Sequence, residues 1–360
     1  MPDTGPILFV TRKWAPATGG METWSLRLSE ALAEHGPIDV IALAGRKNGM
    51  PPSAAALIGF GFTVLSRYMQ LRQRPRVLHL GDMAIWPLAL PALRWKATGI
   101  VLTAHGTDVS YHRRDTLKGR LYGCYLRLGA RVLRRARVIA NSHATARVTR
   151  ETGWRIITVV PLATDFRPPP QPGEQPLPTR DILFAGRLVE RKGCGWFIRE
   201  VLSQLPPDIR LRVAGTCWDA AEKKALNDPR VDFLGPLDQA QLAREYAAAL
   251  CVIVPNIEVA SGEYEGFGLV APEAAAAGGI VIAADHGGLR DAVVDGVTGI
   301  LAKTGEARDW AVKIIEVTQW TEPRRADFQK HAMAEVRARF NWARVAADVR
   351  AVYGAVIADS

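Results

Sequence analysis

Short apolar runs alternate with helical stretches along almost the whole chain of 360 residues, and this alternation restricts the possible folds more than any other feature. Short apolar runs suit strands that are buried on both faces. A repeated order of strand and helix predicts parallel sheets covered by helices on both sides. The expected strands are Ile7–Thr11, Ile38–Leu43, Val77–Leu80, Ile100–Ala104, Val138–Ala140, Asp181–Ala185, Leu211–Ala214, Val231–Leu234, Cys251–Val254 and Val281–Ala283.

A proline-rich stretch divides this pattern into two similar halves. Residues 166–179 contain six prolines and one glycine, which excludes a helix or a central strand there. We therefore expect two α/β domains, 1–165 and 181–340, joined by a linker at 166–180, with a last helix at 341–360. The expected helices are Glu22–Glu34, Leu117–Arg135, Gly195–Gln204, Ala220–Leu226, Ala240–Ala249, Pro272–Ala277, Ala307–Thr318 and Trp342–Ile357.

The composition is that of a soluble globular protein, with 48% apolar and 23% charged residues. Four cysteines form no C-x-x-C pair and no zinc-binding spacing, which favours a reducing compartment. The first residues lack the basic region of a signal peptide, and the apolar run 54–65 is too short to span a membrane. We expect a cytoplasmic protein.

Positive charge is concentrated in the first half, where residues 1–165 hold 23 Lys and Arg against 10 Asp and Glu. Residues 113–137 carry nine of these cations, and apolar residues are interleaved at helical spacing. Such a basic amphipathic helix, together with the apolar run 54–65, suits the anionic surface of an inner membrane. One alternative is that the helix only presents a solvated basic face over core leucines. Another is that the basic half binds a nucleic acid, although no motif for DNA or RNA binding is present.

Two motifs of the first half follow expected strands. Gly19 and Gly20 stand between the first strand and the first helix, where paired glycines and a helix start suit an anion. His105 follows the Ile100–Ala104 strand within the sequence His-Gly-Thr-Asp. A side chain at the carboxyl end of a parallel strand points into the ligand crevice. A plain turn and a packed histidine beside a helix cap are the structural alternatives.

Two further motifs belong to the second half. In Gly186-Arg187-Leu188-Val189-Glu190-Arg191-Lys192-Gly193, glycines flank cations after a strand, an arrangement that suits a diphosphate. A solvated basic turn is the alternative. In the segment 265–273 two glutamates, Glu265 and Glu273, bracket a glycine-containing loop and a helix start. A carboxylate at Glu273 is placed to hold two sugar hydroxyls.

These motifs together resemble the retaining glycosyltransferases of the GT-B fold, specifically family 4. The likeness covers nearly the whole chain and also includes the segments 141–145, 159–165, 231–235 and 295–299. It implies two Rossmann-like domains that face a central cleft. It also implies a last helix that crosses back to the first domain.

The resemblance also implies the roles of individual residues. Arg187 and Lys192 would bind the donor diphosphate, and Glu273 the nucleotide ribose. Glu265 and the segment Phe267, Gly268 and Leu269 would hold the donor sugar and phosphate. Gly19 and Gly20 would meet the diphosphate, His105 would lie near the anomeric carbon, and Gly215 and Phe233 would border the base. The family's glutamate after a glycine pair has no counterpart after Gly287-Gly288.

The implied function is transfer of a hexose from a UDP- or GDP-sugar to a glycan or lipid-linked acceptor, as in bacterial polysaccharide or glycolipid synthesis. With no D-x-D pair and no metal-ligand cluster in the sequence, we expect no metal and no cofactor beyond the nucleotide sugar. A nucleotide-sugar epimerase of the same architecture and a nicotinamide-dependent oxidoreductase are alternatives. The missing G-x-G-x-x-G argues against the oxidoreductase.

Overall fold

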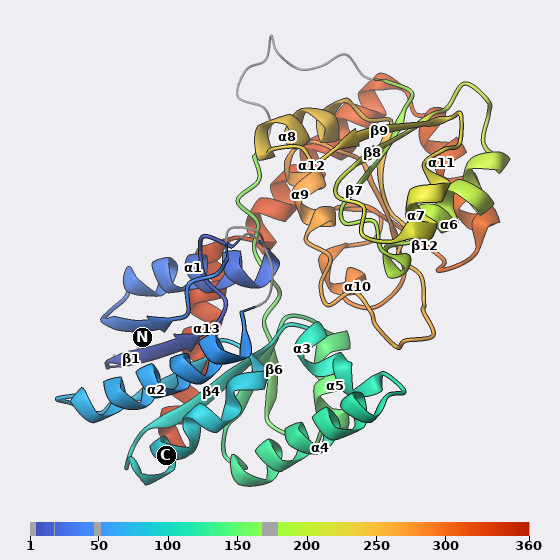
Figure 1. Cartoon of the computed structure of the whole chain (residues 1–360). Helices are drawn as coiled ribbons and strands as arrows, with labels where there is room; N and C mark the ends of the chain where they lie inside the picture. The colour runs from blue at the N-terminus through green and yellow to red at the C-terminus, as the bar shows by residue number, and fades with distance from the viewer. Residues whose placement is uncertain (1–4, 18, 47–51, 168–178, 360) are drawn as a thin grey trace. The chain divides into compact units, whose positions relative to one another are not determined.

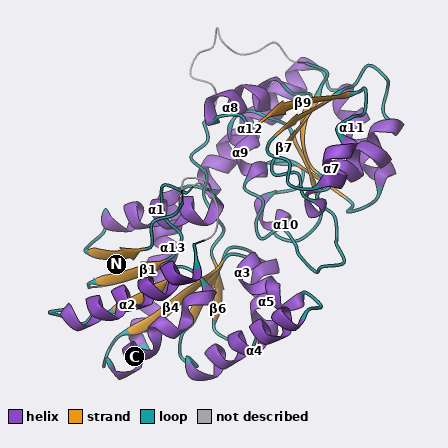
Figure 2. Ribbon diagram, viewed as in Figure 1, coloured by secondary structure: helices purple, strands orange, loops and turns teal. Residues whose placement is uncertain are grey.

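The computed structural model of the protein describes residues 5–17, 19–46, 52–167 and 179–359. The chain forms two compact units, one of Met1–Leu162 with Trp342–Ser360 and the other of Ala163–Asn341. Each unit contains one six-stranded parallel sheet with helices packed on its faces (Figures 1 and 2). The predicted pair of Rossmann-like domains is confirmed. Most of the expected linker, residues 168–178, lies outside the described residues.

The first sheet has the strand order β2-β1-β3-β4-β5-β6, so the chain reverses its direction of travel across the sheet between β1 and β3. Its strands are almost entirely apolar and buried at the centre, as a parallel sheet with two covered faces requires. The elements are β1 (Ile7–Thr11), α1 (Gly20–Ala33), β2 (Ile38–Ala42), α2 (Ala54–Gln70), β3 (Val77–Leu80), η1 (Met83–Arg94), β4 (Gly99–Ala104), α3 (Thr107–Ser110), η2 (Tyr111–Arg113), α4 (Leu117–Val132), β5 (Arg137–Ala140), α5 (His143–Glu151) and β6 (Ile157–Val159).

The second sheet has the order β12-β11-β10-β7-β8-β9, and its reversal lies between β7 and β10. Its elements are β7 (Ile182–Ala185), η3 (Glu190–Lys192), α6 (Cys194–Trp196), η4 (Phe197–Val201), η5 (Leu202–Gln204), β8 (Leu211–Ala214), α7 (Ala220–Ala225), β9 (Val231–Gly235), α8 (Gln239–Ala248), β10 (Cys251–Val254), α9 (Val270–Ala276), β11 (Val281–Ala284), α10 (Leu289–Ala292), β12 (Ile300–Ala302), α11 (Ala307–Thr318) and α12 (Glu322–Arg339).

All ten expected strands are present, and two edge strands, β6 and β12, were not expected. Each of these two has only three residues, too few to show a period. The apolar run 54–65 belongs to the longer helix α2, which begins after Ser53, whose hydroxyl accepts a hydrogen bond from the Ala56 amide at 3.2 Å. The helix η1 was missed because Pro87 and Pro91 interrupt the pattern of an α-helix.

The helix α13 (Trp342–Ala358) completes the first unit, although it follows the whole second unit in the chain. It packs against α1 and against β3, β4 and β5 with a buried face. Tyr353 on this face hydrogen-bonds Nδ1 of His79 at 2.6 Å, and Nε2 of His79 pairs with the Thr103 hydroxyl at 2.8 Å. Burial lowers the pKa of His79 to about 3, so the ring is neutral.

We predict that Tyr353→Phe lowers the free energy of unfolding of the first unit by about 1–3 kcal/mol, because it leaves a buried ring nitrogen of His79 without its partner. Tyr68→Phe is the matched control. The Tyr68 hydroxyl is buried and has no hydrogen-bond partner in the described chain, so its removal costs nothing. Urea unfolding of both variants measures the difference. Equal losses would contradict the role given to the His79 pair.

Candidate functional site

The carboxyl edge of the second sheet gathers most of the motif residues of that unit. The loop after β7 and the loop after β10 meet there, at the reversal of strand order where parallel sheets bind their ligands. Ile257 donates its amide to the Arg191 carbonyl at 3.2 Å, which joins the two loops. Gly193, with φ of 71°, is required because a Cβ there would lie 1.9 Å from the Pro255 carbonyl oxygen.

Glu265 is the centre of a buried charge cluster at this edge. Its Oε2 atom lies 2.5 Å from Lys192 Nζ and 3.0 Å from Arg191 Nη1. The same oxygen accepts a hydrogen bond from the Asn256 amide at 3.2 Å. In the described chain, no donor pairs with Oε1 of Glu265, which leaves that oxygen available to a ligand hydroxyl.

The two glutamates of the motif have opposite electrostatics. Burial raises the pKa of Glu265, but Lys192 and Arg191 outweigh it and hold the pKa at about 2. Burial raises the pKa of Glu273 to about 7, against a smaller opposite effect of Lys192. Within the described ranges the Glu273 carboxylate has no hydrogen-bond donor. Glu273 therefore titrates near neutral pH, where Glu265 is ionised.

The loop between the glutamates presents free amides. No acceptor within the described ranges pairs with the backbone N–H groups of Phe267, Gly268 and Leu269. The loop is held in place by Gly288, whose amide donates to the Glu265 carbonyl at 2.9 Å. A Cβ on Gly288 would lie 2.1 Å from the Gly266 carbonyl oxygen, so the glycine pair 287–288 supports this loop by close packing. Three unpaired amides beside two cations suit an anion.

The Phe267 side chain is part of the packed interior of the second unit. It is buried and its ring packs edge-on against Phe340 at 5.8 Å between centroids. Its contribution to a ligand is therefore limited to its backbone.

Arg187 does not join the cluster around Glu265. Its guanidinium lies over the ring of Trp218, 5.3 Å from the centroid, and Trp218 is 67% exposed. Phe233 on β9 is also exposed. Gly215 has φ of 145°, and a Cβ there would lie 1.8 Å from the Gly186 carbonyl oxygen. Packing alone explains glycine at position 215, and its expected place beside a base stays a prediction.

In the first unit, Gly19 and Gly20 stand at the start of α1, after β1 and beside the reversal of strand order. Glu22 in the first turn already brings a carboxylate to this helix start, since a Cβ on Gly19 would meet its Oε2 at 2.5 Å. Glu22 also pairs with Lys13 at 3.3 Å. Thr18 lies outside the described residues. The predicted contact of Gly19 and Gly20 with a diphosphate is untested.

His105 follows β4 and is buried against Trp24, with ring centroids 4.9 Å apart. Its Nε2 donates to the Gly81 carbonyl at 2.9 Å, and its backbone amide donates to Asp108 at 2.8 Å. The alternative of a packed histidine beside a helix start therefore describes its surroundings well. Its Nδ1 has no partner in the described chain, and its predicted place near an anomeric carbon stays a prediction.

Within the second unit the structure thus brings together Lys192, Glu265 and the 267–269 amides, with Glu273 in the electrostatic field of Lys192. Three residues were missed by sequence reasoning: Arg191, Asn256 and Trp218. Arg191 stood inside a recognised motif, yet only the fold shows that it is buried. Over the described ranges, no three His, Cys, Asp or Glu side chains gather as metal ligands would.

Comparison with known proteins identifies the family of the chain. The family model "Glycosyl transferases group 1" matches residues 179–319, and the model "Glycosyltransferase Family 4" matches residues 18–167. The D-inositol 3-phosphate glycosyltransferase of Corynebacterium aurimucosum is 35% identical over 192 residues, which are 49% of this chain and 44% of that protein. The enzyme of the same name from Xylanimonas cellulosilytica is 32% identical, over 62% of this chain and 59% of its own. The chain spans about half the length of the curated relatives it matches.

Solved structures match over nearly the full chain. Sucrose-phosphate synthase from Thermosynechococcus elongatus superposes with a TM-score of 0.75 at 22% identity, over 99% of this chain and 100% of that one. Anabaena HepE in complex with UDP-glucose gives a TM-score of 0.71 at 19% identity, over 98% and 100% of the two chains. At these identities the likeness shows the fold. With both domain models matched and the two sheets in place, the chain belongs to the family 4, group 1 glycosyltransferases and has their GT-B fold.

Proposed function

We propose that this protein transfers a hexose from a UDP- or GDP-sugar to a glycan or lipid-linked acceptor, with retention of configuration and without a metal ion. One observation carries the proposal: Lys192, the free 267–269 amides and the carboxylates of Glu265 and Glu273 meet at the switch point of the second sheet. Cations and amides suit a diphosphate, and the carboxylates suit the hydroxyls of a ribose and a sugar. HepE, which has the same fold, was crystallised with UDP-glucose.

The proposed mechanism depends on where negative charge develops as the sugar is transferred. The bond between the anomeric carbon and the β-phosphate oxygen breaks, and the leaving diphosphate gains negative charge. Lys192 and the amides of the loop stabilise that charge, and Arg187 is the second cation predicted to bind the diphosphate. The acceptor oxygen attacks the same face of the sugar, and its proton passes to the departing phosphate oxygen. Glu265 binds two cations through Oε2, which argues against its being a nucleophile.

Two classes of acceptor are consistent with the family. The curated relatives are named for D-inositol 3-phosphate, a small phosphorylated polyol, and this favours such an acceptor as the second candidate. The surface of the first unit favours a lipid-linked acceptor. Comparing product formation with inositol phosphate and with a lipid-linked sugar decides between the two.

The first unit exposes large apolar side chains beside its excess of cations. They follow one another along α2 and α4 at helical spacing, with η1 in contact with both helices. We define this as the apolar–basic surface; its exposed apolar members are Ile58, Phe62, Leu65, Met69, Leu90, Leu93, Leu117, Leu121, Leu128 and Val132. None of the described helices is both long and apolar enough to cross a bilayer. We propose that this surface rests on an anionic membrane.

We predict that Lys192→Ala lowers kcat by roughly 10²–10³, the usual effect of losing one preorganised charge at a developing anion. The donor is first selected by thermal shift with UDP, GDP, ADP and their sugars. Lys224→Ala, an exposed cation of the same unit, is the control and keeps its turnover. Near-normal turnover of the purified Lys192 variant would overturn the assignment.

We predict that the affinity for the nucleotide sugar selected by thermal shift, for example UDP-glucose, rises about tenfold from pH 6 to pH 8, because Glu273 must be ionised to accept two ribose hydroxyls and its pKa is about 7. The diphosphate of UDP-glucose does not titrate in this range. Calorimetric titration of Glu273→Gln should give a weak affinity independent of pH. By linkage, the raised pKa also means that the ligand-free protein loses stability as pH rises through about 7, and the glutamine variant does not.

We predict that the protein floats with vesicles containing phosphatidylglycerol at low salt and that Leu121→Ser combined with Leu128→Ser reduces the floated fraction several-fold. Both leucines are exposed on α4, so the change leaves the core intact. Val312→Ser, which alters an equally exposed residue on α11 of the second unit, should float like the unchanged protein. Failure of the unchanged protein to float would refute the membrane contact.

A further inference from the structure

A cavity of about 460 Å³ opens at the edge of the first sheet opposite to His105. It lies where β4 begins and where η1, α4 and α13 end. Apolar side chains such as Leu93, Ile100, Leu133 and Val356 form part of its lining, next to polar and charged groups. Gly99 allows this arrangement, because a Cβ there would lie 2.5 Å from Val356. The cavity is separate from the motifs assigned to sugar transfer, and its size is that of a small-molecule site, roughly 300–1,000 Å³.

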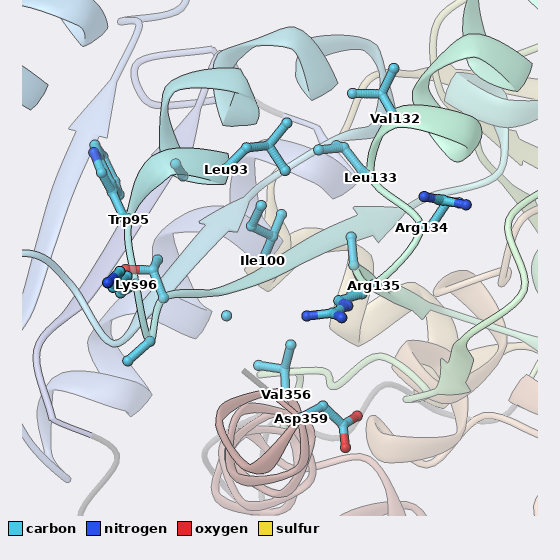
Figure 3. Close-up of a pocket in the computed structure, with 15 residues that line it drawn as sticks. Leu93, Trp95, Lys96, Ile100, Val132, Leu133, Arg134, Arg135, Val356 and Asp359 are labelled. Carbon is cyan, nitrogen blue, oxygen red and sulfur yellow. The ribbon is translucent and has the colours of Figure 1, made fainter.

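Three cations border this apolar space. Lys96, Arg134 and Arg135 all line it, and Figure 3 shows Lys96 and Arg134 on opposite sides of Ile100. Asp359 is the one carboxylate in the lining, and Arg137 outside the lining already pairs with it at 2.6 Å. The cavity lining therefore combines apolar side chains with an excess of positive charge.

Helix ends offer a structural explanation for these three cations. The carboxyl ends of α4 and α13 carry partial negative charge, and basic side chains often cap them. A capping side chain donates to the last carbonyls, as Arg74 does to the Tyr68 carbonyl after α2. In the described parts of the chain, the side chains of Lys96, Arg134 and Arg135 donate to no carbonyl and pair with no carboxylate. The N–H groups of these three side chains are therefore available to a ligand.

The backbone beside Lys96 is strained. Ala97 has φ of 61°, and it is the one non-glycine residue in the left-handed region over the described ranges. An alanine there costs about 1–2 kcal/mol. Ala97 lines the cavity together with its neighbour Lys96.

The cavity is continuous with the apolar–basic surface. Leu93 and Val132 belong to both, since each is exposed on that surface and each lines the cavity. A lipid in a membrane under this surface would therefore meet the apolar side chains of Leu93 and Val132 at the cavity. Guanidinium groups recognise phosphate oxygens in pairs, and an ammonium adds a point charge.

We infer that this cavity binds the phosphate head group and the first tail carbons of an anionic phospholipid, at a site separate from the sugar-transfer site. The inference rests on the proposed membrane contact and adds a specific lipid position to it. The phosphate lies between Arg134, Arg135 and Lys96, and the tail lies along Leu93, Ile100 and Val132. Inorganic phosphate has the same charged chemistry but lacks the tail.

The test uses the full chain and dihexanoyl phosphatidic acid below its micellar concentration, with binding measured by calorimetry at low salt. Binding should weaken at least tenfold in Arg134→Gln with Arg135→Gln. The control, Arg120→Gln with Arg127→Gln, removes the same charge from α4 outside the cavity and should change the affinity less than twofold. Inorganic phosphate and dihexanoyl phosphatidylcholine should each bind at least tenfold more weakly than phosphatidic acid.

Three outcomes would overturn the inference: no binding of phosphatidic acid, equal losses in the two double variants, or equal affinity for inorganic phosphate, which would make the tail irrelevant. The thermal shift produced by UDP should be unchanged in Arg134→Gln with Arg135→Gln. A protein that binds UDP but no phosphatidic acid refutes the lipid site alone, and one that binds phosphatidic acid but no nucleotide refutes the sugar-transfer proposal alone.

Discussion

Glu265 joins two loops that follow different strands of the second sheet, and the geometry of the proposed donor site depends on this contact. One carboxylate oxygen of Glu265, Oε2, binds both Lys192 and Arg191 from the loop after β7, while Glu265 itself follows β10. Breaking a buried ion pair from one side costs about 3–5 kcal/mol, because a charge is left without compensation. The cations are therefore in position before any ligand arrives, which spares the cost of ordering them during binding.

Glycines make this contact feasible. Gly193 lets the first loop approach the Pro255 carbonyl, and Gly288 lets a third loop support the backbone of Gly266. The positions of the charged side chains in the cluster therefore depend on the close packing of the three loops. A substitution at Gly193 or Gly288 would displace Glu265 without touching any charged group.

The sequence predicted the two sheets well, because buried parallel strands are short, apolar and regularly spaced. It also placed Lys192, Glu265 and Glu273 beside a glycine turn or a helix start, where the structure has them, while their roles toward a ligand stay predictions. It could not show that Arg191 is buried beside Glu265, because a motif with three cations does not tell which one points inward. It also could not show that Arg187 rests on Trp218, a contact between loops that follow β7 and β8. The cavity beside β4 left no pattern, because its lining comes from three separate segments, 92–100, 132–136 and 356–359.

The return of α13 to the first unit has a consequence for biosynthesis. The ribosome completes β1 to β6 early, but His79 meets Tyr353 only after residues 163–341 have been made. At about 5–20 residues per second this interval is on the order of ten to forty seconds. During that time the apolar face that α13 later covers is open, because the second unit must be made before α13. The nascent first unit is thus a natural client for a chaperone that binds exposed apolar surface.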